Sequence, residues 1–206
     1  MRTPFRAAVL AVAAGFALLL VQPQGARAEG LEGGVLDEIN FARAHPRQYA
    51  EELRSAADAG ASRGGFESYA DWDPGAFAEA IDFLMHQSPL PPLKLDARLS
   101  AAARDHVREQ GGQGGVGHAG PGGETLGQRL QRRGVWAGLM AENISYGFAD
   151  PRGVVAQLVI DSGVASRGHR KNIFGRAYQA AGVGCGRHAV YASMCVIDFA
   201  GALVAR

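Results

Sequence analysis

Residues 166–174 constrain this chain more than any other stretch, because they hold one histidine between neighbours that fix its position. His169 follows a glycine and precedes two cations, and the apolar residues Ile173 and Phe174 close the segment. The glycine permits a tight backbone bend, and the apolar pair can insert into a core and hold that bend. The segment is therefore predicted to present the imidazole of His169 at one fixed place.

Two earlier stretches have the same character. Residues 117–120 carry His118 on a glycine-rich segment, and residues 141–144 carry Glu142. Together with one further acid they give two histidines and two carboxylates: His118, Glu142, Asp161 and His169. Neutral imidazoles bind zinc, and carboxylates complete its shell or orient the rings. These four residues lie far apart in the sequence and lack a compact signature such as His-Glu-x-x-His. Their spacing alone therefore does not decide whether they form a metal site, form an acid–base site or lie at unrelated positions.

The first 28 residues have the parts of a secretory signal peptide. Two arginines precede the apolar run 7–21, and Ala26-Arg27-Ala28 offers a small-x-small cleavage site. The run is shorter than the roughly 20 residues that a spanning helix needs. We therefore expect removal of residues 1–28 and export of residues 29–206 to the periplasm or the cell exterior, as one domain that is not an integral membrane protein.

Charge and cysteine usage limit the class of protein further. The chain has 21 Lys and Arg against 20 Asp and Glu, and its arginines form no basic tail, so nucleic acid is not an expected partner. Cys185 and Cys195 lie in two segments that resemble strands with a short polar connection between them. In an exported protein a disulfide is the default for such a pair. Neither cysteine has a nearby base in sequence that would favour a catalytic thiol.

Apolar periodicity and helix-capping residues predict a mixture of helices and strands. Helices are expected over 35–53 with a break at Pro46, from Pro74, from the N-cap Asp96 to residue 111, over 124–133, and over 151–160. Strands are expected within 138–147 and twice within 178–200. Residues 56–73 are expected to form a loop. The glycine-rich stretch 111–123 is expected to be ordered, because structure resumes on both sides of it.

The order of these motifs resembles the CAP superfamily, named for cysteine-rich secretory proteins, antigen 5 and pathogenesis-related class 1 proteins, in its secreted bacterial branch. The resemblance rests on residues 93–99, Gly-His-Ala-Gly-Pro-Gly-Gly at 117–123, Ala141-Glu142-Asn143-Ile144, residues 166–173 and the strand 181–185. It covers about residues 35–200, with a family-variable part up to about residue 92. It implies an α+β fold, an α-β-α sandwich with a central antiparallel sheet and an open cleft.

The resemblance also implies a tetrad of two histidines and two acids in that cleft. His118 and His169 match its histidines, and Glu142 matches the acid of the Gly-Glu-Asn motif, here Ala-Glu-Asn. The family's Trp-x-x-Glu helix reads Leu-Val-Ile-Asp at 158–161, so Asp161 is one methylene shorter than the family's acid. Asp161 is therefore expected either to join the tetrad or to brace the loop 161–166.

Three functions follow from these residues. The first is a cleft that binds a small ligand or a divalent cation, zinc in particular, through His118 and His169. The second is a hydrolase of the peptidase or esterase type that uses Glu142 and the histidine pair. The third is an envelope interaction or scaffold protein whose tetrad is structural. An enzyme has the least support, because neither Ser145 nor Ser166 lies in a nucleophile elbow. The expected partner is a small ligand, a lipid or an envelope protein.

The remaining polar residues are assigned structural or surface roles. Asn40 and Arg43 are expected to brace the first helix. The cations Arg167, Arg170 and Lys171 are expected on a solvated surface, with an anionic ligand as the alternative. The other histidines are expected on the surface or on helices: His45, His86, His106 and His188.

Overall fold

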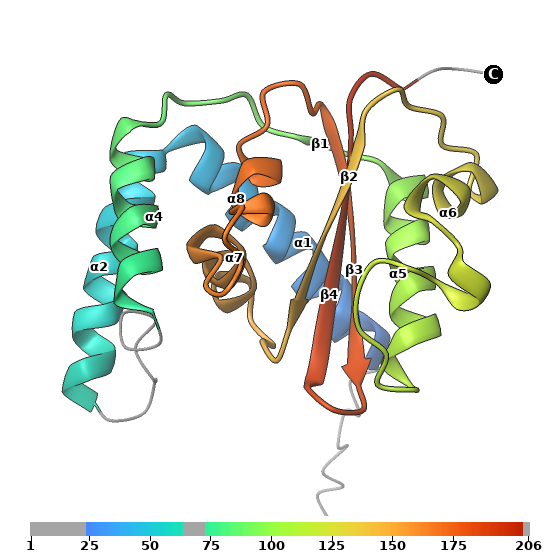
Figure 1. Cartoon of the computed structure of the whole chain (residues 1–206), viewed down its shortest axis with the longest axis horizontal. Coiled ribbons are helices and arrows are strands. Elements are labelled where there is room, and N and C mark those ends of the chain that lie inside the picture. Colours follow the sequence, from blue (N-terminus) through green and yellow to red (C-terminus); the bar gives the residue numbers. More distant parts are fainter. Residues whose placement is uncertain (1–23, 64–72, 204–206) are drawn as a thin grey trace, which may run out of the picture.

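The computed structural model describes residues 24–63 and 73–203. Within them, a four-stranded sheet lies between two layers of helices (Figure 1). The strands, in spatial order, are β1 (Lys94–Leu95), β3 (Ala180–His188), β4 (Ala192–Ala200) and β2 (Met140–Tyr146). β1 pairs with β3 in parallel, while β3 with β4 and β4 with β2 are antiparallel. The predicted α-β-α sandwich is confirmed.

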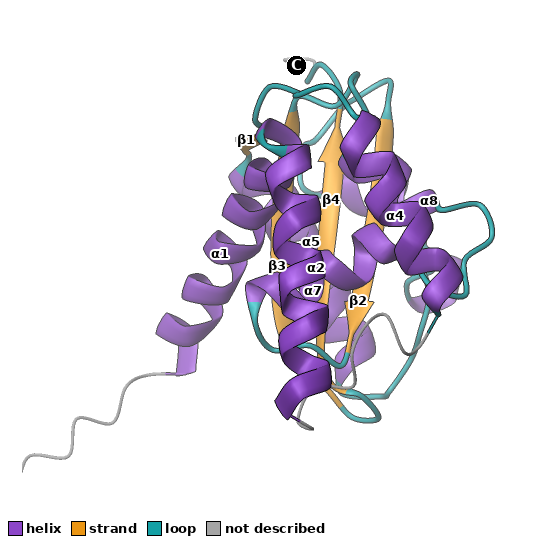
Figure 2. Cartoon of the chain, turned by 90° about the vertical axis from the view of Figure 1, so that its left-hand side faces the viewer, coloured by secondary structure: helices purple, strands orange, loops and turns teal. Residues whose placement is uncertain are grey.

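Helices cover both faces of this sheet. One face carries α5 (Ala97–Gly111) and α6 (Leu126–Arg132), with the 3-10 turn Pro121–Gly123 between them, and the other carries α1 (Gln24–Ala44), α7 (Pro151–Ile160) and α8 (Gly168–Ile173). Farther out, α2 (Pro46–Arg63) and α4 (Pro74–His86) form a pair, which Figure 2 shows in front of the sheet. Among the described residues, no helix is both long and apolar enough to cross a membrane.

The alternation of side chains along β4 divides the core between the two layers. Cys195, Ile197 and Phe199 pack into the large cluster formed with α1, α2, α4 and α7. Met194 and Val196 point the other way, into a cluster with α5. Because successive side chains of a strand face opposite sides, Asp198 shares the α5 face with Val196. Asp198 is therefore a buried carboxyl group on the same face as the apolar side chains of Met194 and Val196.

α5 lies directly on β3, and two glycines make this possible. A Cβ atom at Gly182 would lie 2.1 Å from the backbone nitrogen of Ser100, and one at Gly184 would lie 2.4 Å from that of Arg104. The Ser100 hydroxyl also accepts a hydrogen bond from the Val183 backbone N–H, at 3.2 Å. Any side chain at either glycine would have to push the helix off the strand.

The helix starts predicted at Pro74, after Asp96 and at Pro151 are confirmed, and their caps show why they hold. The first helix begins at Gln24, before the predicted residue 35, and the helix predicted over residues 124–133 spans Leu126–Arg132. The Asp73 side chain accepts from the Ala76 backbone N–H, that of Asp96 from Arg98 N–H, and that of Asp150 from Gly153 N–H. Each satisfies a donor that the first turn of a helix leaves open. The two helices that follow Asp73 and Asp150 also begin with proline, which suits the first helical position.

The predicted loop over residues 56–73 is wrong in its first part, because α2 continues to Arg63. Alanine-rich sequence has high helix propensity, and Ala57 in this segment is 7% exposed and packs in the core. The rest of the predicted loop, residues 64–72, lies outside the described residues. So does the predicted signal peptide up to residue 23.

Asn40 and Arg43 do not brace their own helix; they tie α1 to other segments. The amide of Asn40 exchanges two hydrogen bonds with the Leu93 backbone, at 3.1 and 2.8 Å. The guanidinium of Arg43, which is 1% exposed, donates to the carbonyls of Pro91 and Ile173, the latter at 2.6 Å. These contacts fix the end of α8 against α1.

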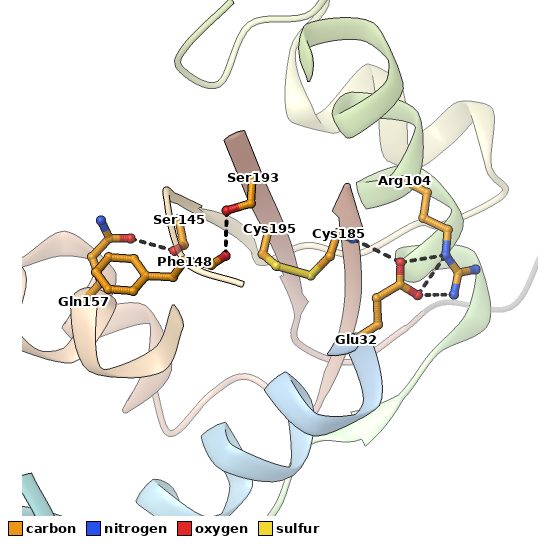
Figure 3. The surroundings of a disulfide bond; sticks show 8 residues. All are labelled: Glu32, Arg104, Ser145, Phe148, Gln157, Cys185, Ser193 and Cys195. Carbon is orange, nitrogen blue, oxygen red and sulfur yellow. Dashed lines mark hydrogen bonds and ion pairs between the residues drawn. A yellow bond between two sulfur atoms is a disulfide. The ribbon is translucent and has the colours of Figure 1, made fainter. Parts of the chain in front are cut away.

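The disulfide between Cys185 and Cys195 is confirmed (Figure 3). The two residues are direct partners across β3 and β4. β1 covers the outer edge of β3 only at residues 180–181. Beyond that point Glu32 of α1 accepts a hydrogen bond from the Cys185 backbone N–H at 3.0 Å and forms an ion pair with Arg104. α1 therefore takes the place of a neighbouring strand at this position.

Candidate functional site

The four predicted residues meet as two histidine–carboxylate pairs beside β2, the last strand in the described sheet. Alternation along β2 places the side chains of Glu142 and Asn143 on opposite faces. Glu142 supports His118 on the α5 side, and Asn143 supports the segment of His169 on the α8 side. A single dipeptide of the strand thus serves both halves of the site.

The first half centres on Glu142, whose side chain is 2% exposed. Its Oε1 lies 2.8 Å from Nδ1 of His118, and its Oε2 accepts a hydrogen bond from Arg129, which is fully buried. A buried carboxylate is stable when a cation and hydrogen bonds compensate it. Glu142 is therefore a buried, compensated acid and not a surface acid at the end of a strand.

The glycine-rich loop that carries His118 is anchored along its length. The backbone N–H of Gly117, a residue with φ +93°, donates to the Tyr146 hydroxyl at 3.0 Å. The Gly117 carbonyl accepts from Nε2 of His106 at 2.9 Å and from the Gln110 amide at 2.8 Å. These bonds explain why a segment so rich in glycine holds a histidine in place instead of acting as a linker.

The second half centres on Asp161, which is 2% exposed and lies just after α7. Its Oδ1 lies 2.6 Å from Nδ1 of His169. Its Oδ2 accepts from the backbone N–H groups of His169, at 2.9 Å, and Arg170, at 3.4 Å. Asp161 therefore does both things that the sequence left open: it pairs with the second histidine, and it braces the segment in which that histidine lies.

Two further side chains hold α8 in place. The Asn143 amide donates to the His169 carbonyl at 3.0 Å and accepts from the Asn172 amide at 2.8 Å. The guanidinium of Arg170 is buried, and it donates to the carbonyls of Val159 at 2.6 Å and Ile160 at 2.9 Å. The expectation that Arg170 lies on a solvated surface is wrong, because this cation joins α8 to the end of α7.

Both imidazoles line one cavity of about 250 Å³. Its wall also contains the apolar side chains of Ile144, Leu158 and Val164 and the polar side chains of Tyr146, Gln157 and Ser162. His118 is the more open histidine, with 58% of its side chain exposed against 24% for His169. In each pair the carboxylate engages Nδ1, so Nε2 is the ring nitrogen left for other contacts.

The electrostatics of the His118 half are set by its carboxylate. The hydrogen bond from His118 to Glu142 raises the pKa of the imidazole, and partial burial opposes this. Behind the loop, burial lowers the pKa of His106, and its Nε2 donates to a carbonyl. A neutral His106 therefore fits its place, which is 0% exposed.

The described residues do not supply a complete metal shell or an activated serine. No group of three or more His, Cys, Asp or Glu side chains in them is arranged to hold a metal ion. Ser145 is 1% exposed and donates to the Gln157 side chain at 2.6 Å. Ser162, which lines the cavity, bonds to Asp73 at 3.2 Å. A hydrolase with a serine nucleophile therefore has no support in this geometry.

The sequence missed several residues of the site region. His188 is 3% exposed, and its Nε2 lies 2.8 Å from the Gly115 carbonyl, so its assignment to the surface is wrong. Arg129 escaped notice because nothing in its short helix distinguishes it from the exposed arginines Arg132 and Arg133. Asp198 did carry a signal: it is the single charged residue in the apolar strand β4.

Comparisons with known proteins identify the family of the chain. The sequence model of the cysteine-rich secretory protein family, CAP, matches residues 36–199. No curated protein matches the chain. Among solved structures, an extracellular protein containing an SCP domain from Bacillus anthracis is 26% identical, with a TM-score of 0.48 over 66% of this chain and 43% of that one.

Two more solved structures are similar at lower identity. An outer surface protein of Borrelia burgdorferi is 18% identical (TM-score 0.45, covering 54% of this chain and 79% of that one). A cysteine-rich secretory protein of Staphylococcus aureus is 17% identical (TM-score 0.41, covering 66% and 42%). The matched part spans less than half of the Bacillus and Staphylococcus chains. On the family match over residues 36–199, the chain belongs to the cysteine-rich secretory protein (CAP) family.

Proposed function

We propose that this protein is an exported binding protein whose cleft holds one divalent cation, zinc in the first instance, between Nε2 of His118 and Nε2 of His169. The observation that carries the proposal is the matched presentation of the two rings. Each has its Nδ1 bonded to a buried carboxylate, and both line the same cavity. Metal-binding histidines in proteins are held in this way, with the second nitrogen bonded to a carboxylate or carbonyl.

The carboxylates decide which nitrogen carries the proton. A carboxylate oxygen only accepts, so the neutral ring next to it carries its proton on Nδ1 and has its lone pair on Nε2. This is the form that a cation requires. Glu142 and Asp161 therefore orient both rings so that Nε2 can bind a cation, and neither carboxylate is itself a ligand.

Two histidines leave coordination positions open. Since the described residues offer no third ligand of the usual kind, water or an oxygen atom of a small ligand would complete the shell. The bound cation would supply Lewis acidity toward such an oxygen. The aliphatic side chains of Leu158 and Val164 and the ring of Tyr146 would contact the rest of the ligand.

Export is part of the proposal. The disulfide between Cys185 and Cys195 suits an oxidising compartment, and the first 28 residues carry the pattern of a signal peptide. Sequencing the N-terminus of the protein secreted by its own cells would test this. We expect a mature chain that begins at Glu29, and an unprocessed chain that stays with the cell would contradict it.

Calorimetric titration with zinc tests whether the cleft binds the cation. It is done at about pH 8, which is above the reference histidine pKa of about 6.5. We expect one site in the wild type and affinity losses of tenfold or more in His118→Ala and in His169→Ala. His86→Ala is the matched control, because His86 is exposed and lies on α4 outside the cavity. Equal affinity in all four proteins would overturn the proposal. A lower melting temperature of His169→Ala without zinc binding by the wild type would favour a scaffold role.

A further inference from the structure

β2 is the last strand of the described sheet, so one of its edges has no strand beside it. In an antiparallel pair, hydrogen-bonded residues alternate with residues whose N–H and C=O point away from the partner strand. Two bonds at the ends of β2 set this alternation: Gly147 N–H donates to the Ser193 carbonyl at 3.0 Å, and Gly201 N–H donates to the Leu139 carbonyl at 2.9 Å. With the register of β2 on β4, the odd-numbered residues of β2 bond to β4 and the even-numbered residues do not.

Ile144 therefore points its backbone N–H and C=O away from β4. Neither group has a hydrogen-bond partner in the described part of the chain. Farther along this edge, the Tyr146 carbonyl already accepts from the Gln157 amide at 3.2 Å. Ile144 is only 7% exposed, and nearly all buried backbone groups in proteins are paired. An unpaired donor and an unpaired acceptor on one buried residue therefore indicate a place where a ligand binds.

This unpaired residue lies in the candidate cleft. Ile144 lines the same cavity as both imidazoles. His118 is supported on the α5 side of β2 and the segment of His169 on the α8 side, so the two histidines approach the edge of the strand from its two faces. Leu158 and Val164 supply apolar surface in the same wall. The cleft thus combines an open strand edge with two imidazoles and an apolar contact area.

We infer that the ligand of the cleft is an extended peptide segment, which adds to the edge of β2 as a further strand. An extended residue presents its own N–H and C=O on one side, and these two groups pair with the C=O and N–H of Ile144. The added segment runs between His118 and His169. Because side chains alternate along a strand, one of them contacts Leu158 and Val164. The main-chain bonds define the class of ligand, and the apolar contact favours an apolar side chain at that position.

The link between this peptide and the cation rests on the proposed function. A carbonyl oxygen has two lone pairs. The peptide oxygen that accepts from Ile144 N–H can therefore also complete the shell of a cation bound to His118 and His169. The addition of the strand itself uses only backbone groups and does not require the cation. Peptide binding measured with zinc and with a chelator therefore separates the two claims.

An array of random-sequence hexapeptides, acetylated at one end and amidated at the other, tests the inference on the secreted protein, with zinc and with EDTA. We expect a set of these peptides to bind. In the best binder, N-methylation of the one amide that donates to the Ile144 carbonyl should lower the affinity about tenfold or more, because a buried acceptor is left unpaired. A wild type that binds no peptide, or a binder that tolerates N-methylation at every amide, would overturn the inference.

Ile144→Pro is the sharpest variant, because proline lacks an N–H but is accepted in an edge strand where that N–H would point outward. Ile144→Ala is its matched control, because it loses most of the side chain and keeps the N–H. We expect peptide affinity to be about tenfold or more lower in Ile144→Pro than in Ile144→Ala, with similar melting temperatures in the two variants. Equal affinity in both, or loss of the fold in Ile144→Pro alone, would overturn the inference.

Amide hydrogen exchange checks the edge without any substitution. In the free protein the N–H of Ile144 should exchange faster than those of Asn143 and Ser145, which face β4, and a bound peptide should slow it about tenfold or more. Slow exchange at Ile144 in the free protein would contradict an open edge. A dimer in sedimentation equilibrium that Ile144→Pro dissociates would place a second copy of the chain on this edge, and would overturn the inference.

Zinc titration of the same proteins distinguishes the two levels. Zinc binding by His118 and His169 in a protein that binds no peptide refutes the peptide ligand alone. Peptide binding in EDTA that depends on the Ile144 N–H, in a protein that binds no zinc, refutes the proposed function alone.

Discussion

The two halves of the cleft reach the same presentation of an imidazole by different means. In the His118 half the carboxylate lies on a strand and is compensated by a buried side chain, Arg129. In the His169 half it ends a helix, and the backbone of the next helix compensates it. The first arrangement depends on residues that are distant in sequence, whereas the second is nearly complete within residues 161–170.

The difference also shows in the backbone. The loop before His118 reaches positive φ only at glycines, Gly114 and Gly117. The His169 half does so at Gly163 and also at two residues with side chains, Asp161 (φ 57°) and Arg167 (φ 51°). Non-glycine residues in this region carry a conformational cost. In the His169 half, the hydrogen bonds of the Asp161 carboxylate and of the Arg167 guanidinium offset it. The loop of His118 avoids this cost by placing a glycine at the position with positive φ.

The largest expected effect breaks the His118 half by removing both buried acids near Arg129, which are Glu142 and Asp198. The double variant Glu142→Gln/Asp198→Asn leaves Arg129 without a buried anion, which costs about 3–5 kcal/mol of unfolding free energy. Each single variant should cost much less, because the remaining carboxylate can carry the charge. Urea denaturation of the four proteins measures this coupling. A double-variant cost equal to the sum of the two single costs would contradict the shared charge.

A smaller loss of unfolding free energy is expected when the carboxylate of the His169 half is replaced by an amide. Asp161→Asn removes the charge from three hydrogen bonds, so the unfolding free energy should fall by about 1.5–3 kcal/mol. Adding it to the double variant above should give additive costs, since the two halves do not share a partner. Strong coupling between Asp161 and the pair of Glu142 and Asp198 would show that the halves are not independent.

The sequence predicts the two halves of the site unequally, and the reason is the same difference between local and distant contacts. His169, its glycine and Asp161 lie within nine residues, and that local pattern predicted a fixed imidazole. The segments of Glu142 and His118 were also noticed from their local character, and the family resemblance assigned them to one tetrad. Arg129 was not found, because its role depends on how α6 packs on β2. Asp198 was visible as an acid in an apolar strand, yet its partner lies on another strand. The burial of His188 and Arg170 likewise depends on tertiary packing that no local pattern encodes.

Gly117→Ala probes the loop of the His118 half with a modest effect. No atom lies within 4 Å of the added Cβ, so the cost comes from the φ of +93° alone. We expect a loss of about 1–2 kcal/mol in thermal unfolding, with weaker zinc binding. Arg176→Ala, at an exposed position after α8, is a control of ordinary surface character. A variant as stable as the wild type would show that the loop relaxes freely.

The smallest expected effect is the change of stability with pH that the titration of His118 causes. Its raised pKa means that the pairing with Glu142 stabilises the fold fully below the unfolded-state value of about 6.5. This contribution is lost as pH rises through the folded-state pKa. Zinc competes with the proton, so zinc affinity should increase over the same rise. Proton NMR of the ring should show a pKa above about 6.5 that falls in Glu142→Gln, and an unshifted pKa would contradict the pairing.

Anomalous diffraction at the zinc edge, from crystals grown with zinc near pH 8, shows directly whether the two rings hold one cation between them. We expect one strong peak in the cavity, about 2.0–2.1 Å from Nε2 of both His118 and His169, with each Nδ1 still bonded to its carboxylate. A peak bound through Nδ1, or zinc found only at exposed histidines such as His45 and His86, would contradict it.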